Sequence, residues 1–174
     1  MSQIICPKCG NANTRPSTIS LLYCTDCQTD FGGDHRDFEK NTNRIVLNTY
    51  QKGAASQNLT FSKTPTGATI EGPFLCYYPD LPEIYINHHQ WNQLLQGFYG
   101  LFVIDWKSDY TAADTPDDFG WDLKIIFDNR DPIMSNGQGC YPPYWDALMN
   151  HFGGIGLPNI GNKLGQNFLQ LQQA

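Results

Sequence analysis

The sequence contains little positive charge and no long apolar run. Its 11 lysine and arginine residues stand against 17 aspartate and glutamate residues, which gives a formal net charge of −6. The longest apolar stretch, residues 98–106, is interrupted by Gly100 and is far shorter than the roughly 20 residues that a membrane-spanning helix needs. The first residues, MSQIICPKCG, lack the basic and apolar regions of an export signal. We therefore expect a soluble cytoplasmic protein that binds no membrane and keeps its thiols reduced.

The length and composition are those of a folded protein. At 174 residues the chain has the size of one domain, or of a small module followed by one ordinary domain. Hydrophobic residues make up 40% of the chain and charged residues 16%, which differs from the composition of a disordered chain. We expect the chain to form a packed core.

Four of the six cysteines form two Cys-x-x-Cys pairs near the start of the chain. One pair is Cys6 and Cys9, the other is Cys24 and Cys27, and 14 residues separate them. Two residues between the thiols let one tight turn direct both sulfurs at one ion, and Gly10 can supply the positive φ that such a turn often needs. The spacing is close to that of a four-cysteine zinc site. Because four thiolates leave no coordination position for water, we predict one structural Zn²⁺ ion.

The segments CPKCG and CTDCQTDF resemble the two knuckles of a zinc ribbon, and the resemblance covers residues 4–31. Residues 1–33 are therefore predicted as a zinc ribbon, in which residues 19–23 form a short strand that leads into the second pair. Gln28 stands where the second knuckle often has glycine. Two other interpretations stay open: a rubredoxin-like iron site, whose pairs are usually separated by a longer segment, and a disulfide framework, which needs an oxidising compartment.

Charge decides which kind of partner suits the ribbon, because many proteins that resemble zinc ribbons bind nucleic acid. Residues 1–44 carry five basic and five acidic side chains, and a Zn²⁺ ion with four thiolates adds about two negative charges. Phosphate binding depends on clustered lysine and arginine, and the sequence contains no such cluster. We therefore expect a protein partner and no binding of DNA or RNA.

The remainder of the chain is predicted as an α+β domain over residues 45–153, with an antiparallel sheet and two or three helices. Polar residues 34–44 are predicted as a linker or an extended connection, which implies that the ribbon can be removed without unfolding the domain. Strands are predicted at residues 45–50, 59–63, 68–78 and 121–127. The last of these strands has the clearest alternation, with four apolar side chains on one side: Trp121, Leu123, Ile125 and Phe127.

Two helices are predicted in this domain. Asn87 followed by Gln90 marks a helix start, after which apolar residues recur at helical spacing: Trp91, Leu94, Leu95, Phe98 and Phe102. Because glycines weaken the end of this helix, the alternative prediction for residues 101–106 is a strand. Residues 135–139 are predicted as a loop before the second helix, which two prolines open. Its buried stripe is predicted to contain Tyr144 or Trp145, Leu148, Met149 and Phe152, with Gly153 as its stop.

The end of this domain resembles a segment of many bacterial proteins of unknown function. The shared pattern is a Trp-x-Leu-x-Ile-x-Phe strand, a glycine loop, and then Tyr-Pro and Trp-x-x-Leu at the start of a helix. The matching residues are Trp121, Leu123, Ile125, Phe127, Gly137, Tyr141, Pro142, Trp145 and Leu148. This chain has Gly139-Cys140 where the pattern often has Asn-Ala. The resemblance implies no established activity.

Candidate catalytic groups are few. Cys140 precedes a predicted helix, a setting that can lower the pKa of a thiol, and His151 is a possible partner. His151 is expected three turns along the same helix, so a buried inert thiol is the favoured interpretation of Cys140, as it is of Cys76. His88 and His89 are adjacent on a predicted helix, point about 100° apart and do not easily share a metal. We therefore assign no catalytic residue.

Two functional hypotheses follow. The leading one is a noncatalytic binding or adaptor protein, whose ribbon presents a rigid surface and whose α+β domain recognises a protein or a small ligand. The alternative is an enzyme with a pocket in the α+β domain that uses Cys140, a histidine and acidic residues. Residues 154–174 are predicted as a glycine-rich connection and a short helix that docks on the domain or on a partner. The sequence does not indicate an oligomeric state.

Overall fold

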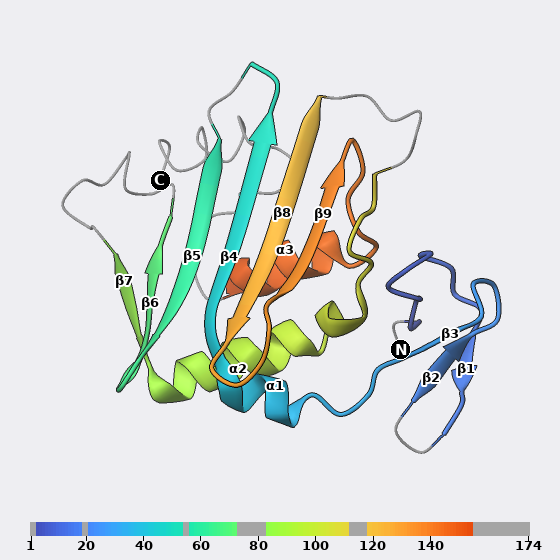
Figure 1. Ribbon diagram of the computed structural model, residues 1–174, viewed down its shortest axis with the longest axis horizontal. Helices are drawn as coiled ribbons and strands as arrows, with labels where there is room; N and C mark the ends of the chain where they lie inside the picture. Colours follow the sequence, from blue (N-terminus) through green and yellow to red (C-terminus); the bar gives the residue numbers. More distant parts are fainter. Residues whose placement is uncertain (1–2, 19–20, 54–55, 73–82, 112–117, 155–174) are drawn as a thin grey trace.

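The structure, a computed structural model, describes residues 3–18, 21–53, 56–72, 83–111 and 118–154. These residues form the predicted α+β fold, with a three-stranded antiparallel sheet, a six-stranded antiparallel sheet and three α-helices. The small sheet lies beside the large one (Figure 1). Within this part of the chain, every helix is too short or too polar to cross a bilayer.

The elements follow one another in a simple order. The small sheet contains β1 (Thr14–Pro16), β2 (Leu22–Cys24) and β3 (Thr29–Phe31). The large sheet contains, in spatial order, β7 (Ile84–Asn87), β6 (Gly67–Glu71), β5 (Gln57–Thr64), β4 (Thr42–Gln51), β8 (Phe119–Phe127) and β9 (Ile133–Gln138). The helices are α1 (Arg36–Asn41), α2 (His88–Tyr99) and α3 (Trp145–Gly154).

Strand β4 organises the large sheet, because it pairs with β5 on one side and with β8 on the other. Strands β4 to β7 form a meander, and β8 and β9 are then added to the opposite side of β4. The register sets Leu47 opposite both Leu59 and Leu123, so apolar side chains gather on one face. The predicted alternation in β8 is confirmed by four buried side chains: Trp121, Leu123, Ile125 and Phe127.

Helices α2 and α3 cover one face of the large sheet (Figure 1). The predicted start of α2 is confirmed, since the Asn87 side chain accepts from the Gln90 backbone N–H and the Gln90 side chain accepts from the Asn87 backbone N–H, each at 2.9 Å. The ring of Phe152 on α3 lies 5.0 Å from that of Phe61 on β5. Apart from Phe102, the two helices bury the predicted stripes, with Trp91, Leu94, Leu95 and Phe98 in α2 and Trp145, Leu148, Met149 and Phe152 in α3.

Two predictions of local structure are wrong. Most of residues 135–139, predicted as a loop, belong to β9. The two buried residues of β9, Ser135 and Gly137, are small because the strand passes close to the core. A Cβ on Gly137 would lie 2.6 Å from Trp121 Nε1. Residues 101–106 are not a strand, because Phe102 adopts a φ of 59° and leads into a 3₁₀ turn at Val103–Asp105. Phe102 therefore leaves the stripe of α2.

The predicted linker, residues 34–44, contains α1 and the start of β4. Its single apolar side chain, Phe38, packs against Phe127 with a centroid distance of 5.6 Å. One apolar residue gives no helical periodicity, so the sequence does not reveal α1. The predicted C-terminal helix, the end of the predicted strand 68–78 and Cys76 lie outside the described residues.

Candidate metal centre

The two cysteine pairs lie on two turns of matching geometry. In the first turn the backbone N–H of Gly10 donates to the Cys6 carbonyl at 2.9 Å, and in the second that of Gln28 donates to the Cys24 carbonyl at 2.9 Å. Gly10 has a φ of 78°, as predicted, and Gln28 has a φ of 58°. Gln28 thus adopts the left-handed conformation that glycine takes in the first turn, and both turns direct their thiols to one point.

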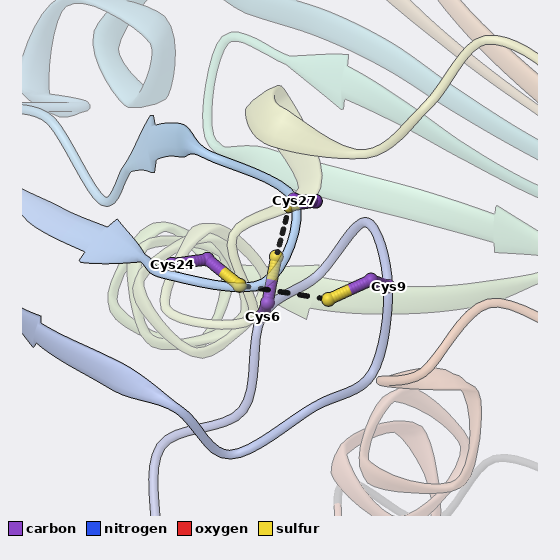
Figure 2. A group of neighbouring side chains, drawn as sticks. All are labelled: Cys6, Cys9, Cys24 and Cys27. Carbon is purple, nitrogen blue, oxygen red and sulfur yellow. Dashed lines mark hydrogen bonds between the residues drawn. The ribbon is translucent and has the colours of Figure 1, made fainter.

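The four cysteine sulfurs lie within 4.8 Å of one another. Figure 2 shows them facing a common centre. The Sγ–Sγ distance is 3.6 Å between Cys6 and Cys27 and also 3.6 Å between Cys9 and Cys24. In a tetrahedral site with metal–sulfur bonds of about 2.3 Å, neighbouring sulfurs lie about 3.8 Å apart. A disulfide requires about 2.05 Å, and all four thiols are free. The cluster can therefore hold a metal ion.

Hydrogen bonds from neighbouring donors favour the thiolate form of two of the sulfurs, Cys6 and Cys27. The Lys8 backbone N–H donates to Cys6 Sγ at 3.4 Å. The Thr29 hydroxyl, 3.0 Å from Cys27 Sγ, lowers the pKa of that thiol to about 7 by donating to the thiolate. Burial raises the pKa of the Cys6 thiol, so this group requires a nearby positive charge to ionise. A bound cation would supply that charge.

In the described part of the ribbon, residues 3–18 and 21–33, these ligands form most of the buried apolar core. Its buried cluster consists of Cys6, Cys24 and Phe31, with Leu22 and Cys27 packed against it. Two of the three fully buried members are thus metal-site residues. Small metal-binding modules with so little apolar burial typically obtain most of their folding free energy from the bound ion.

Two tyrosines of the larger domain bind the backbone on both sides of Cys6. The Tyr144 hydroxyl donates to the Ile5 carbonyl at 2.8 Å and lies 3.2 Å from the Ile5 backbone N–H. The Tyr110 hydroxyl donates to the Pro7 carbonyl at 2.6 Å. Burial raises the pKa of both tyrosines, which keeps their hydroxyls protonated. The larger domain therefore fixes the position of the first knuckle.

An aromatic contact joins the second half of the ribbon to the same region. The Phe102 ring lies 5.1 Å from Phe31 and 5.4 Å from Tyr144. The Gly32 backbone N–H donates to the Asp105 carboxylate at 3.0 Å. Removal of the ribbon would expose Phe102 and leave Asp105 without this donor. The predicted independence of the ribbon stays a prediction, and these are the contacts that its removal would break.

The other candidate residues have separate surroundings. Cys140 Sγ lies 3.6 Å from the carbonyl of the next residue, whereas His151 Nε2 lies 2.9 Å from the Leu94 carbonyl and links α3 to α2. His88 and His89 are exposed at the start of α2. Across the described ranges, the ribbon cysteines are the only group of three or more histidine, cysteine, aspartate or glutamate side chains with the geometry to hold a metal.

Sequence reasoning missed the residues that attach the ribbon, namely Tyr110, Tyr144, Phe102 and Asp105. Tyr144 is 139 positions from Ile5, and no motif connects them. The sequence presents Tyr144 only as a possible member of the helix stripe. Tyr110 and Tyr144 are identified by a hydroxyl that donates to a distant backbone carbonyl. This contact forms only in the folded chain.

Comparisons with known proteins give no relative from which to transfer a role: no family model, no curated protein and no solved structure matches this chain. The C-terminal resemblance over residues 121–148 thus has no support from a family match. The interpretation of the metal centre rests on its own geometry.

Substitution of Thr29 tests whether its hydroxyl supports metal binding. Thr29→Val should weaken metal binding about tenfold, because partners of metal ligands typically contribute that much. Thr25→Val is the matched control, since the Thr25 hydroxyl lies in the same knuckle but donates to the Asn13 carbonyl at 3.0 Å. Titration with Co²⁺, followed by thiolate-to-metal charge-transfer absorption, measures both affinities. An equal loss in the two variants would show that the Thr29 hydroxyl has no specific effect.

Proposed function

We propose that the protein is a zinc-binding, noncatalytic adaptor that recognises a protein partner. The observation that carries this proposal is the closed set of four sulfurs, Cys6, Cys9, Cys24 and Cys27, all within 4.8 Å of one another. Thiolates in a tetrahedral arrangement suit Zn²⁺, and four of them leave no position for a substrate or a catalytic water. The ion then has a structural role, which is to hold the ribbon as a rigid surface.

Charge supports a protein as the partner. In the described part of the ribbon, residues 3–18 and 21–33, Lys8 and Arg15 are balanced by Asp26 and Asp30. A Zn²⁺ ion with four thiolates would make this surface net negative by about two charges, which is unfavourable for nucleic acid. Free thiols of this kind persist in a reducing compartment, and we place the protein in the cytoplasm on that ground.

Metal analysis tests the identity of the ion. Protein purified without added metal should contain about one zinc per chain, and Cys24→Ser should lose it, because a three-thiolate site binds much more weakly. Cys140→Ser is the matched control and should retain the metal, since Cys140 is not in the cluster. Iron as the native metal, or a disulfide between Cys6 and Cys9, would contradict the proposal.

Site-specific photo-crosslinking in cells tests the partner. In the test variant a crosslinking amino acid replaces Ile4, which is 43% exposed on the ribbon. In the control variant it replaces Tyr85, which is 53% exposed on the large sheet. Position 4 should capture a protein, and Cys24→Ser should abolish this product because the ribbon loses its metal. The captured protein is then purified and its binding to the zinc-loaded chain measured directly. Crosslinks to nucleic acid, or no protein product from position 4, would overturn the adaptor proposal.

A further inference from the structure

A second candidate site lies away from the metal centre, in a hollow of about 330 Å³ formed by α1, the end of β5 and the start of α2. Its floor contains the apolar side chains of Trp91 and Leu95, which are only 2% and 3% exposed. The hollow has the volume of a small-molecule site, and an apolar floor with polar groups above it is the usual construction of such sites.

Basic side chains from three elements line this hollow. Arg36 and Lys40 lie four residues apart in α1, Lys63 belongs to β5, and His88 is the first residue of α2. Three of the chain's 11 lysine and arginine residues thus line one hollow of a protein whose net charge is −6. Like charges one helical turn apart are unfavourable unless an anion compensates them.

The hollow also offers uncommitted donors. Lys40 has no ion pair within the described part of the chain. The side-chain amides of Asn92 and Gln96 line the same hollow from α2 and are exposed. Ammonium and amide N–H groups around one point suit an oxyanion, which accepts several hydrogen bonds at once.

Nearby carboxylates limit the size of the anion. Arg36 contacts Asp34 at 2.7 Å, and Lys63 contacts Asp128 at 3.4 Å. Glu39 is the one acidic residue in the lining, and together with Asp34 and Asp128 it balances the three cations, so an anion binds here by displacing a carboxylate from one of the exposed ion pairs. A phosphate monoester, which carries about −1.5 to −2 charges at pH 7, competes with such a carboxylate through its greater charge, whereas the phosphates of a long polyanion would also meet the other flanking carboxylates.

We propose that this hollow binds a small organic phosphate monoester, with the phosphate among Arg36, Lys40 and Lys63 and the organic part on Trp91 and Leu95. The site makes no use of the ribbon cysteines, so it does not depend on the function proposed above. It assigns a small-ligand role to the larger domain.

Phenyl phosphate is the probe, because it combines an aromatic ring with one phosphate group. It is titrated into the ¹⁵N-labelled full-length protein at constant ionic strength while amide chemical shifts are recorded. Saturable shifts should concentrate on residues 36–40 and 88–96. Lys40→Gln and Lys63→Gln should each weaken binding about tenfold, the loss expected for one charge-assisted hydrogen bond.

Two controls separate a built site from general electrostatics. Lys52→Gln removes the same charge from an exposed turn after β4, at the other end of the sheet, and should leave the affinity unchanged. Phenol, which lacks the phosphate, should cause no comparable shifts. The proposal is wrong if no saturation occurs, if phenol gives the same shifts, or if Lys52→Gln weakens binding as much as Lys40→Gln. It is also wrong if an oligonucleotide occupies the same residues more tightly than phenyl phosphate.

Discussion

The convergence of four cysteine sulfurs on one point is the interaction on which the N-terminal part of the structure depends. Within the described part of the ribbon, the buried apolar cluster contains Cys6, Cys24 and Phe31, and two of these are members of the sulfur cluster. Three strands of three residues each cannot supply a core of their own. We therefore expect the ribbon to gain its shape from a bound metal ion, for which the two turns provide the ligands.

The second constraint is the attachment of this small module to the larger domain. Tyr110 and Tyr144 hold the backbone on either side of Cys6, and Phe102 packs between Phe31 and Tyr144. These contacts give the ribbon a fixed orientation as well as a fixed shape. In the adaptor role that we propose, a fixed orientation would preorganise the binding surface and lower the entropic cost of association.

The sequence predicts features that depend on short spacings and misses those that depend on distant residues. The cysteine pairs, the capping residues Asn87 and Gln90, and the alternation of β8 each span a few positions, so their geometry follows from local rules. Helix α1 and strand β9 lack apolar periodicity, because Phe38 is the single apolar residue of α1 and the two buried positions of β9 are Ser135 and Gly137. The tyrosine contacts and the cationic hollow likewise bring together residues from separate elements, which no local pattern records.

Hydrogen exchange with and without bound metal is the most direct test of the central claim, which is that one ion holds the ribbon together. The Gly10 and Gln28 amides, which donate to the Cys6 and Cys24 carbonyls, report on the two turns. When a chelator removes the metal, these amides should lose their protection while β4 and β8 keep theirs. Equal protection of the two turns in the presence and absence of metal would contradict the account.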